Sequence, residues 1–482
     1  MAKTLKEKTA QGLLWSAVSN LLTQVLNVLI GIFLARLLTP ADYGLVGMLA
    51  IFTAIAGSLQ ESGFIAALTN LKVISHRDYN AVFWFSTTVS LTLYTLLFFS
   101  APLIARFFHH PELVDLSRLV FAGFVAGGIG IAHSAYMFRN MMNKEKAVIN
   151  LFALAGSGTV GITLALNGYA YWSLAWQQLT YIVIYDLGRL YYVRWLPTLP
   201  VDMTPVKEMF GFSSKLLVTN IVNQVNNNVL SLIFGRLFPA KTVGNYTQAA
   251  KWNTMGYSLI SSTIQQVAQP VLASINDQQE RQLNAFRKML RFTAFLSMPA
   301  LFGLALVSEE FITLLLSEKW IDSVPLLQIL CISGAFLPIH TLYQSLLISR
   351  GRSNAYMWCT IAQIVTQISI ILAFSAWGIE VMITAFSTML VLWTFVWNAV
   401  AHHLLGLRFR DVFRDIAPFF FISIGCLAVT YYVTQSIEQP ALLLTARVVL
   451  AGALYAGVMK VVRVAIFNEC FEYLGKYLHK KK

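Results

Sequence analysis

The chain has 482 residues, of which 57% are hydrophobic and only 12% are charged, and its formal net charge is +13. This composition is far from that of soluble proteins, so it excludes an ordinary soluble enzyme of two or three domains. Basic loops on one side of a membrane and attraction to anionic lipid account for the positive charge, and we expect no nucleic-acid partner.

Apolar stretches of roughly 20–28 residues follow one another along the chain, and short polar loops separate them. Each stretch is long enough to cross a hydrocarbon core of ~30 Å as a helix, and a backbone in lipid must satisfy its own hydrogen bonds. The sequence therefore predicts an all-α polytopic membrane protein with about fourteen transmembrane helices. The predicted spans are residues 12–37, 44–69, 80–106, 114–138, 147–167, 169–193, 212–238, 244–270, 290–315, 324–348, 355–377, 379–404, 412–434 and 441–463.

Lysine and arginine are concentrated in every second connection, for example around Lys144 and Arg287, whereas the other connections hold few, such as Lys241 and Lys319. Because basic loops stay in the cytoplasm, both termini are predicted to be cytoplasmic and the number of spans to be even. The first apolar run lacks a small-residue cleavage pattern, so we expect it to remain as a helix. The four cysteines lie far apart and form no metal-binding or redox motif, so no metal or cofactor is expected.

The chain repeats itself at an offset of 200 residues, because N-L-L-T-Q-V-L-N from Asn20 to Asn27 matches N-I-V-N-Q-V-N-N from Asn220 to Asn227. Six predicted spans separate the copies, and an even number gives both the same orientation. The sequence therefore predicts two six-helix lobes related by a pseudo-two-fold axis along the membrane normal, with a cleft between them. The predicted domains are an N-lobe at 1–200, a C-lobe at 201–405, and two extra helices with a basic tail at 406–482.

Carboxamide side chains recur on one face of the helix in each copy. Such groups need polar partners in hydrocarbon, and they serve either as glue between helices or as the lining of a wet cleft. The density of asparagine in the second copy favours the cleft. We therefore predict substrate-binding roles for Asn20, Gln24 and Asn27 in the first copy and for Asn220, Gln224 and Asn227 in the second.

These segments resemble a known family. A-R-L-L-T-P-A-D-Y-G-L-V, ending at Val46, and E-S-G-F-I-A-A-L, from Glu61 to Leu68, look like the start of Wzx-type polysaccharide flippases. F-G-R-L-F-P-A-K-T-V-G-N-Y-T-Q-A-A-K, ending at Lys251, resembles their seventh and eighth helices. The similarity covers roughly residues 10–410, and the colanic-acid-exporter type of the multidrug/oligosaccharidyl-lipid/polysaccharide exporter superfamily is the nearest subgroup.

This resemblance implies a flippase in the bacterial inner membrane, and we expect the protein to act as a monomer. Its substrate would be an undecaprenyl-pyrophosphate-linked oligosaccharide, moved from the cytoplasmic to the periplasmic leaflet, and polysaccharide polymerase machinery would be a partner. The seventh helix of such proteins often carries an aspartate where this chain has Asn227 or Asn228, which weakens the case for a carboxylate ion site there.

Ionisable residues within spans are functional candidates because charge is costly in a bilayer. Lys251 is predicted to hold the pyrophosphate, and Lys215 to meet the headgroup near the cytoplasmic end of the seventh span. Snorkelling to the headgroup region is the alternative for both lysines. Glu61 is a candidate for ion coupling, with a structural ion pair as its alternative. Two acid–base pairs at i, i+3 spacing are expected to form local salt bridges, namely Asp115 with Arg118 and Asp186 with Arg189.

The predicted function is therefore export of a polyprenyl-linked glycan by alternating access, with the lipid tail left in the membrane. The sequence has no nucleotide-binding loop, so an ion or substrate gradient would supply the energy. The alternatives are a multidrug or organic-cation antiporter of the same superfamily, a peptidoglycan lipid II flippase, and a membrane glycosyltransferase or ligase. The short outward loops argue against this last class, and we expect no enzymatic activity and no catalytic residues.

Overall fold

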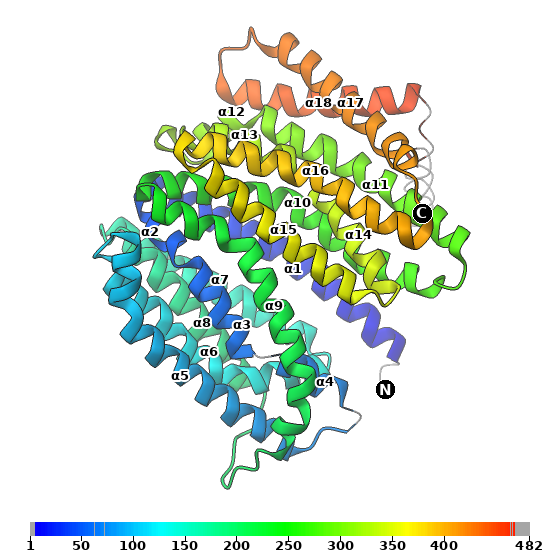
Figure 1. The fold of residues 1–482 in the computed structure, drawn as a ribbon. Helices are drawn as coiled ribbons and strands as arrows, with labels where there is room; N and C mark the ends of the chain where they lie inside the picture. Colours follow the sequence, from blue (N-terminus) through cyan, green and yellow to red (C-terminus); the bar gives the residue numbers. More distant parts are fainter. Residues whose placement is uncertain (1–4, 62, 72, 463, 465, 468–482) are drawn as a thin grey trace. The chain divides into compact units, whose positions relative to one another are not determined.

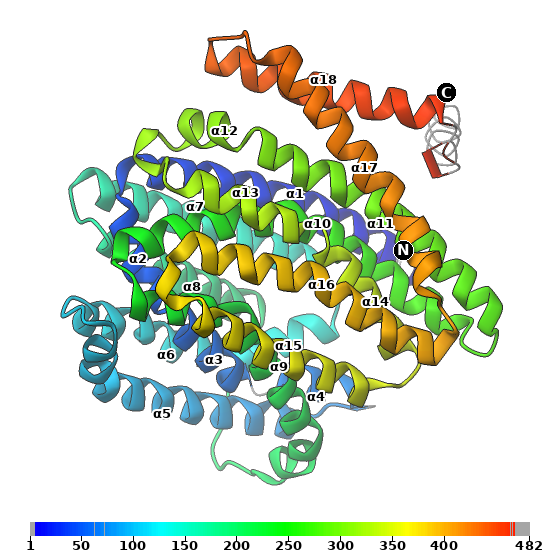
Figure 2. The same cartoon turned by 45° about the horizontal axis from the view of Figure 1, so that its top comes forward.

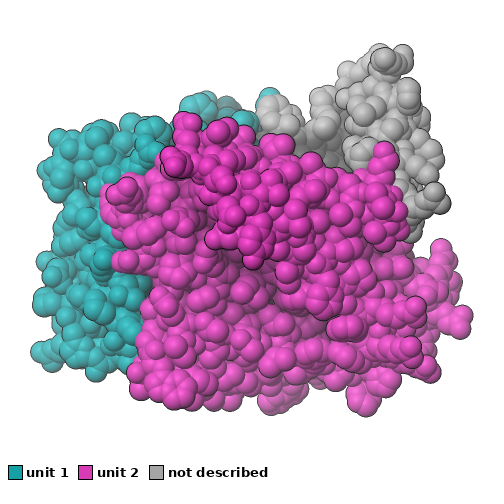
Figure 3. All heavy atoms as spheres, turned by 90° about the horizontal axis from the view of Figure 1, so that it is seen from above, with its two compact units in different colours: residues 1–244 teal, residues 245–482 magenta. Residues whose placement is uncertain are grey.

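The computed structural model describes residues 5–61, 63–71, 73–462, 464 and 466–467, and these residues form two compact units, 1–244 and 245–482 (Figures 1 and 3). The first unit contains α1 (Leu5–Leu37), α2 (Pro40–Met48), α3 (Ala50–Glu61), α4 (Phe64–Asn70), α5 (His76–Phe108), α6 (Leu113–Arg139), α7 (Asn143–Leu166), α8 (Trp172–Tyr192) and α9 (Thr204–Leu237).

Helix α10 (Ala240–Ser274) begins at the end of the first unit and continues into the second. The rest of the second unit contains α11 (Gln279–Leu306), α12 (Ser308–Leu315), α13 (Ser323–Gly334), α14 (Leu337–Ser349), α15 (Ser353–Ala373), α16 (Ile379–Leu405), α17 (Phe409–Thr434), α18 (Pro440–Val461) and the short 3-10 turns η1 (Glu318–Trp320) and η2 (Ser375–Trp377).

The prediction of an all-α polytopic membrane protein is confirmed. Within the described residues, 11 helical segments are long and apolar enough to cross a membrane. Helices α8, α9 and α10 occupy the places of the predicted sixth, seventh and eighth spans, and their polar side chains lower their hydropathy. That these three helices also cross the membrane stays a prediction, as does the division into lobes at 1–200, 201–405 and 406–482.

Three predicted spans are divided among shorter helices. The tenth, predicted at 324–348, consists of α13 and α14, which are separated by residues 335–336. The ninth, predicted at 290–315, is interrupted at Val307, where α11 ends and α12 begins. Glu309 and Glu310 lie in the first turn of α12, where carboxylates favour a new helix N-terminus. The second span, predicted at 44–69, is divided among α2, α3 and α4. The Thr39–Asp42 capping box starts α2, because the Asp42 carboxylate accepts hydrogen bonds from the Thr39 backbone N–H at 2.8 Å and from its hydroxyl at 2.7 Å.

Equivalent positions of the repeat contact each other reciprocally inside the first unit. A Cβ added at Gly44 would overlap the carbonyl oxygen of Ala240, and one added at Gly244 would overlap the carbonyl oxygen of Pro40. Residues 40 and 44 correspond to 240 and 244 at the offset of 200 residues. A contact in which each copy offers the same surface to the other is what a local two-fold relation requires. Only glycine permits this backbone-to-backbone approach.

The segment between α8 and α9 is fastened to the N-terminal end of α5. The Asn80 amide donates to the carbonyl oxygen of Thr198 at 2.9 Å and accepts from its N–H at 2.9 Å, while the indole of Trp195 donates to His76 Nδ1 at 2.8 Å. Hydrogen bonds from Thr204, together with Arg77, lower the pKa of the exposed Asp202 carboxyl to about 2. The segment between α8 and α9 is thus held against α5 by hydrogen bonds and an ion pair.

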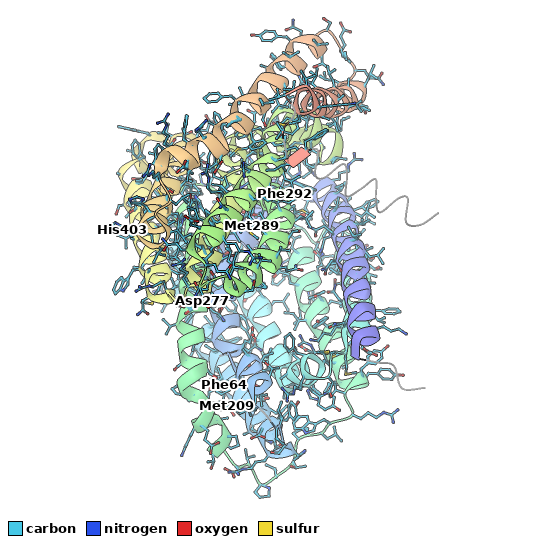
Figure 4. All side chains as sticks on the ribbon, turned by 90° about the vertical axis from the view of Figure 1, so that its right-hand side faces the viewer. Phe64, Met209, Asp277, Met289, Phe292 and His403 are labelled. Carbon is cyan, nitrogen blue, oxygen red and sulfur yellow. The ribbon has the colours of Figure 1, made fainter. Side chains whose placement is uncertain are left out.

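Helix α9 packs on α3, α4 and α5 in the first unit, and Figure 4 labels Phe64 of α4 and Met209 of α9 in one hydrophobic cluster. In the second unit, α17 packs along α11 and α18 packs on α17 and α12 (Figure 2). A buried ion pair joins α18 to α12, because Arg447 of α18 donates to Glu310 of α12 at 2.5 Å.

Candidate functional site

A polar cavity lies inside the first unit between α3, α6 and α8. Its volume is about 490 Å³, and its polar lining includes Glu61, Gln178, Tyr181, Asp186 and Arg189. We call it the α3–α6–α8 cavity. Charged and amide side chains are expensive in a membrane-spanning bundle and usually mark a site. This grouping is therefore the first candidate for a functional site.

The helix is broken at the point where Glu61 lines this cavity. Glu61 is the last residue of α3, and α4 begins at Phe64 after Gly63, whose φ of 69° is left-handed. Only glycine adopts this conformation without strain. Broken helices inside a bilayer are tolerated where they line a cavity or are buried in protein, and in transporters they often form the binding site.

Asp186 and Arg189 form the predicted salt bridge on α8, with 2.6 Å between Arg189 Nη1 and Asp186 Oδ1. The pair is largely buried, and the guanidinium also lies 4.2 Å from the centroid of the Tyr185 ring. Gly130 of α6 leaves room for the pair, because an added Cβ would overlap the Asp186 carboxylate and lie 2.6 Å from Arg189 Nη1. The pair is an element of the cavity wall as well as a local interaction along the helix.

A second polar cavity of about 420 Å³ lies between α1, α7 and α8 and shares Gln178 and Tyr181 with the first. In its wall, the Asn150 amide donates to the Thr23 hydroxyl at 2.7 Å and accepts from the Tyr181 hydroxyl at 2.8 Å. Asn27, one of the predicted substrate-binding residues, also lines this α1–α7–α8 cavity. Amides and hydroxyls in alternation suit hydrogen bonding to sugar hydroxyl groups, since each can donate and accept.

Lys251 lies on α10 in the second unit and is partly buried, with its ammonium 5.9 Å from the centroid of the Trp252 ring. Its neighbours Gln248, Trp252 and Asn253 are buried, and each keeps a polar side-chain atom without a hydrogen-bond partner among the described residues. Unpaired buried polar atoms are costly, so this part of α10 is polar in a way that packing alone does not explain.

The other predicted site residues are distributed over α1 and α9. Asn20 and Asn227 are exposed, and Gln24, Asn220 and Gln224 are partly buried. The side chain of Lys215 lies outside the described residues. Four further residues line a cavity although no pattern in the sequence predicts a binding role for them, namely Asn150, Gln178, Tyr181 and Arg189. The signals that the sequence offered for this region were the ionisable residues within spans, namely Glu61 and the Asp186–Arg189 pair.

The helical membrane fold with polar internal cavities defines a polytopic membrane transporter. The chain belongs to the family described as polysaccharide biosynthesis protein, whose model matches residues 33–325. It is a transporter rather than an enzyme, as its relatives and structural neighbours are.

Two relatives and one solved structure illustrate the similarity. The lipopolysaccharide biosynthesis protein WzxC of Escherichia coli (strain K12) is 27% identical over 356 residues, which are 72% of this chain and 71% of that protein. The succinoglycan biosynthesis transport protein ExoT of Rhizobium meliloti (strain 1021) is 24% identical over 362 residues, 74% of this chain and 73% of that protein. The lipid II flippase MurJ in its inward closed conformation has the same fold, with a TM-score of 0.77, 13% identity, and coverage of 95% of this chain and 98% of MurJ.

Proposed function

We propose that this protein moves a polyprenyl-pyrophosphate-linked oligosaccharide from the cytoplasmic to the periplasmic leaflet of the bacterial inner membrane. The observation that carries the proposal is the pair of polar cavities that share Gln178 and Tyr181 of α8. The amides and hydroxyls in these walls fit a sugar chain, and the relatives WzxC and ExoT belong to polysaccharide biosynthesis. In this proposal the protein acts as a monomer and hands its cargo to polysaccharide polymerase machinery.

The charged residues take distinct roles in this proposal. Lys251, with Lys215, stabilises the pyrophosphate during crossing, because an anion entering a low-dielectric path must replace its water by other charge-stabilising groups. Asn20, Gln24, Asn27, Asn220, Gln224 and Asn227 provide the polar lining of that path. Glu61, at the helix break, couples transport to an ion by changing its charge.

The test is deletion of the gene followed by analysis of lipid-linked glycans in the inner leaflet and of glycan at the cell surface. We expect a lipid-linked glycan to accumulate inside and surface glycan to disappear. A plasmid copy carrying Gln178→Ala with Tyr181→Phe should restore export poorly, whereas Leu187→Ala on the exposed side of α8 should restore it fully. Unchanged glycan distribution in the deletion strain would contradict the proposal.

One observation favours a second candidate, export of an organic cation. The α3–α6–α8 cavity carries the carboxylates of Glu61 and Asp186 against the single guanidinium of Arg189. With all three ionised, its net charge is negative and would attract a cation. Increased sensitivity of the deletion strain to cationic dyes, with normal surface glycan, is the result that this second function requires.

A further inference from the structure

A groove on the second unit, between α16 and α17, has no part in the proposed transport path. Its volume is about 200 Å³ and its lining is rich in phenylalanine. Phe409 and Phe413 of α17 and Phe395 of α16 are between 45% and 55% exposed, and the rings of Phe395 and Phe409 are 5.0 Å apart. Phe409 and Phe413 are one turn apart, so they form a continuous edge along the groove.

The groove presents almost only carbon to an occupant. Thr394 and Asn398 lie in its wall, but the Thr394 hydroxyl and Asn398 Oδ1 are hydrogen-bonded to side chains of α14. His340 Nε2 lies 3.0 Å from the Thr394 hydroxyl, and the Tyr343 hydroxyl donates to Asn398 Oδ1 at 3.5 Å. A sugar or a peptide backbone would find little hydrogen bonding here, whereas a hydrocarbon chain loses nothing by entering.

The turn between α16 and α17, which leads to Phe409 in the groove lining, carries three arginines and is positively charged. Arg408, Arg410 and Arg414 are exposed at this turn, and in Figure 4 His403 labels the end of α16 that leads into it. Arg410 and Arg414 follow Phe409 and Phe413 by one residue each, so their side chains lie about 100° around the helix from the groove edge. Long arginine side chains can reach from there to the mouth of the groove.

The two acidic residues in these turns of α17, Asp411 and Asp415, pair with α11. Asp415 accepts two hydrogen bonds from Arg287 of α11, at 2.7 and 3.2 Å, and Asp411 lies 3.4 Å from the same guanidinium. Arg291 lies 3.8 Å from Asp415. The carboxylates are therefore neutralised against α11, and the arginines beside the groove keep their positive field for an external anion.

We propose that this groove binds one anionic phospholipid, with an acyl chain along the phenylalanine edge and the phosphate at Arg410 and Arg414. Charge complementarity selects this occupant, because basic pockets between transmembrane helices bind anionic headgroups. The site is independent of the transported substrate. In this site the two arginines distinguish an anionic from a zwitterionic headgroup, and the groove fixes the position of one acyl chain.

The test uses the full-length protein, delipidated in detergent and titrated with phosphatidylglycerol or phosphatidylethanolamine of identical chains, with native mass spectrometry as the readout. Wild type should retain phosphatidylglycerol preferentially. Arg410→Gln with Arg414→Gln should weaken its binding about 5-fold per arginine, or roughly 25-fold in total at low salt, and should remove the preference. Higher salt should reduce the difference.

Two further variants separate this site from general charge. Arg281→Gln with Arg352→Gln removes the same charge from exposed positions elsewhere in the second unit and should leave the preference unchanged. Ala417→Trp fills the groove and should abolish specific binding although all arginines remain. Equal loss in both arginine pairs, no effect of Ala417→Trp, or equal retention of the two lipids by wild type would each overturn the proposal. Displacement of phosphatidylglycerol by an equimolar polyprenyl phosphate would also overturn it, by assigning the groove to the substrate.

Discussion

Gly130 of α6 leaves the space in which Asp186 and Arg189 pair in the cavity wall. Replacing Gly130 by alanine in a helix would ordinarily gain about 1 kcal/mol of stability. Here the added methyl group overlaps the carboxylate, and overpacking costs typically about 1–3 kcal/mol. We therefore expect Gly130→Ala to lower the unfolding temperature in detergent and to impair export, whereas Gly457→Ala, where nothing lies within 4 Å, should be neutral or stabilising. A Gly130→Ala variant that is more stable than wild type would show that α6 and α8 move apart at little cost and accommodate the added methyl group.

Lys251 is the residue on which the proposed headgroup binding depends most. Removing a favourable contact to a charged group costs about 1.5–3 kcal/mol, which corresponds to roughly ten- to hundred-fold weaker binding. Lys251→Ala should therefore severely reduce glycan export while the protein accumulates normally in the membrane. Lys251→Arg should retain part of the activity, and Lys251→Glu should be the worst because it repels the anion. Comparable export by wild type and the Ala and Glu variants, at matched abundance, would show that Lys251 only snorkels.

At the scale of helices, one buried ion pair joins α18 to α12. The side chains of Arg447 and Glu310 are only 9% and 7% exposed. Arg447→Met leaves an unpaired buried carboxylate and should cost about 3–5 kcal/mol of stability, whereas the double variant with Glu310→Leu should recover most of that loss. Unfolding of the three variants in detergent micelles gives the coupling energy from a double-mutant cycle. Additive effects of the two substitutions would mean that the pair does not hold α18 to α12.

The asparagine and glutamine side chains on one face of α1 and of α9 are predicted to line a wet path, and their accessibility to reagents tests this role. Cysteine at Asn27 or Asn227 should react with small hydrophilic thiol reagents in a cysteine-free background, because these positions are predicted to line a wet path. Val25 and Val225 lie off the predicted face of each helix and should react less. Equal protection of all four positions would favour a role as glue between helices.

The helices were largely predictable from the sequence, because hydropathy over a span is a local property. The salt bridges Asp115–Arg118 and Asp186–Arg189 were predictable for the same reason, since i, i+3 neighbours meet on any helix. The cavities were not, because they depend on how closely α6 and α8 approach. The pairing of Glu310 with Arg447 was missed as well, because 137 residues separate them. Tertiary packing decides such contacts, and a single sequence does not encode them locally.

At the scale of the whole molecule, the reciprocal contact at Gly44 and Gly244 constrains the topology. Because each glycine touches the backbone of the other copy, residues 40–44 and 240–244 must lie on the same side of the membrane. The number of crossings between them is therefore even, which agrees with the independent prediction from the basic loops. A measurement of the membrane topology therefore tests whether the two copies of the repeat have the same orientation.

Reporter fusions provide that test. Fusions after residues 75, 142, 283 and 410 should read as cytoplasmic, and those near residues 110, 168 and 320 as periplasmic, because lysine and arginine gather in the first group of connections. Two insertions, after Leu38 and after Phe238, should both read as periplasmic, since these residues lie in the short connections that lead into α2 and α10. Opposite signals from this last pair cannot coexist with the glycine contact, and a reversal at any site in the first twelve predicted spans would exclude two lobes of the same orientation.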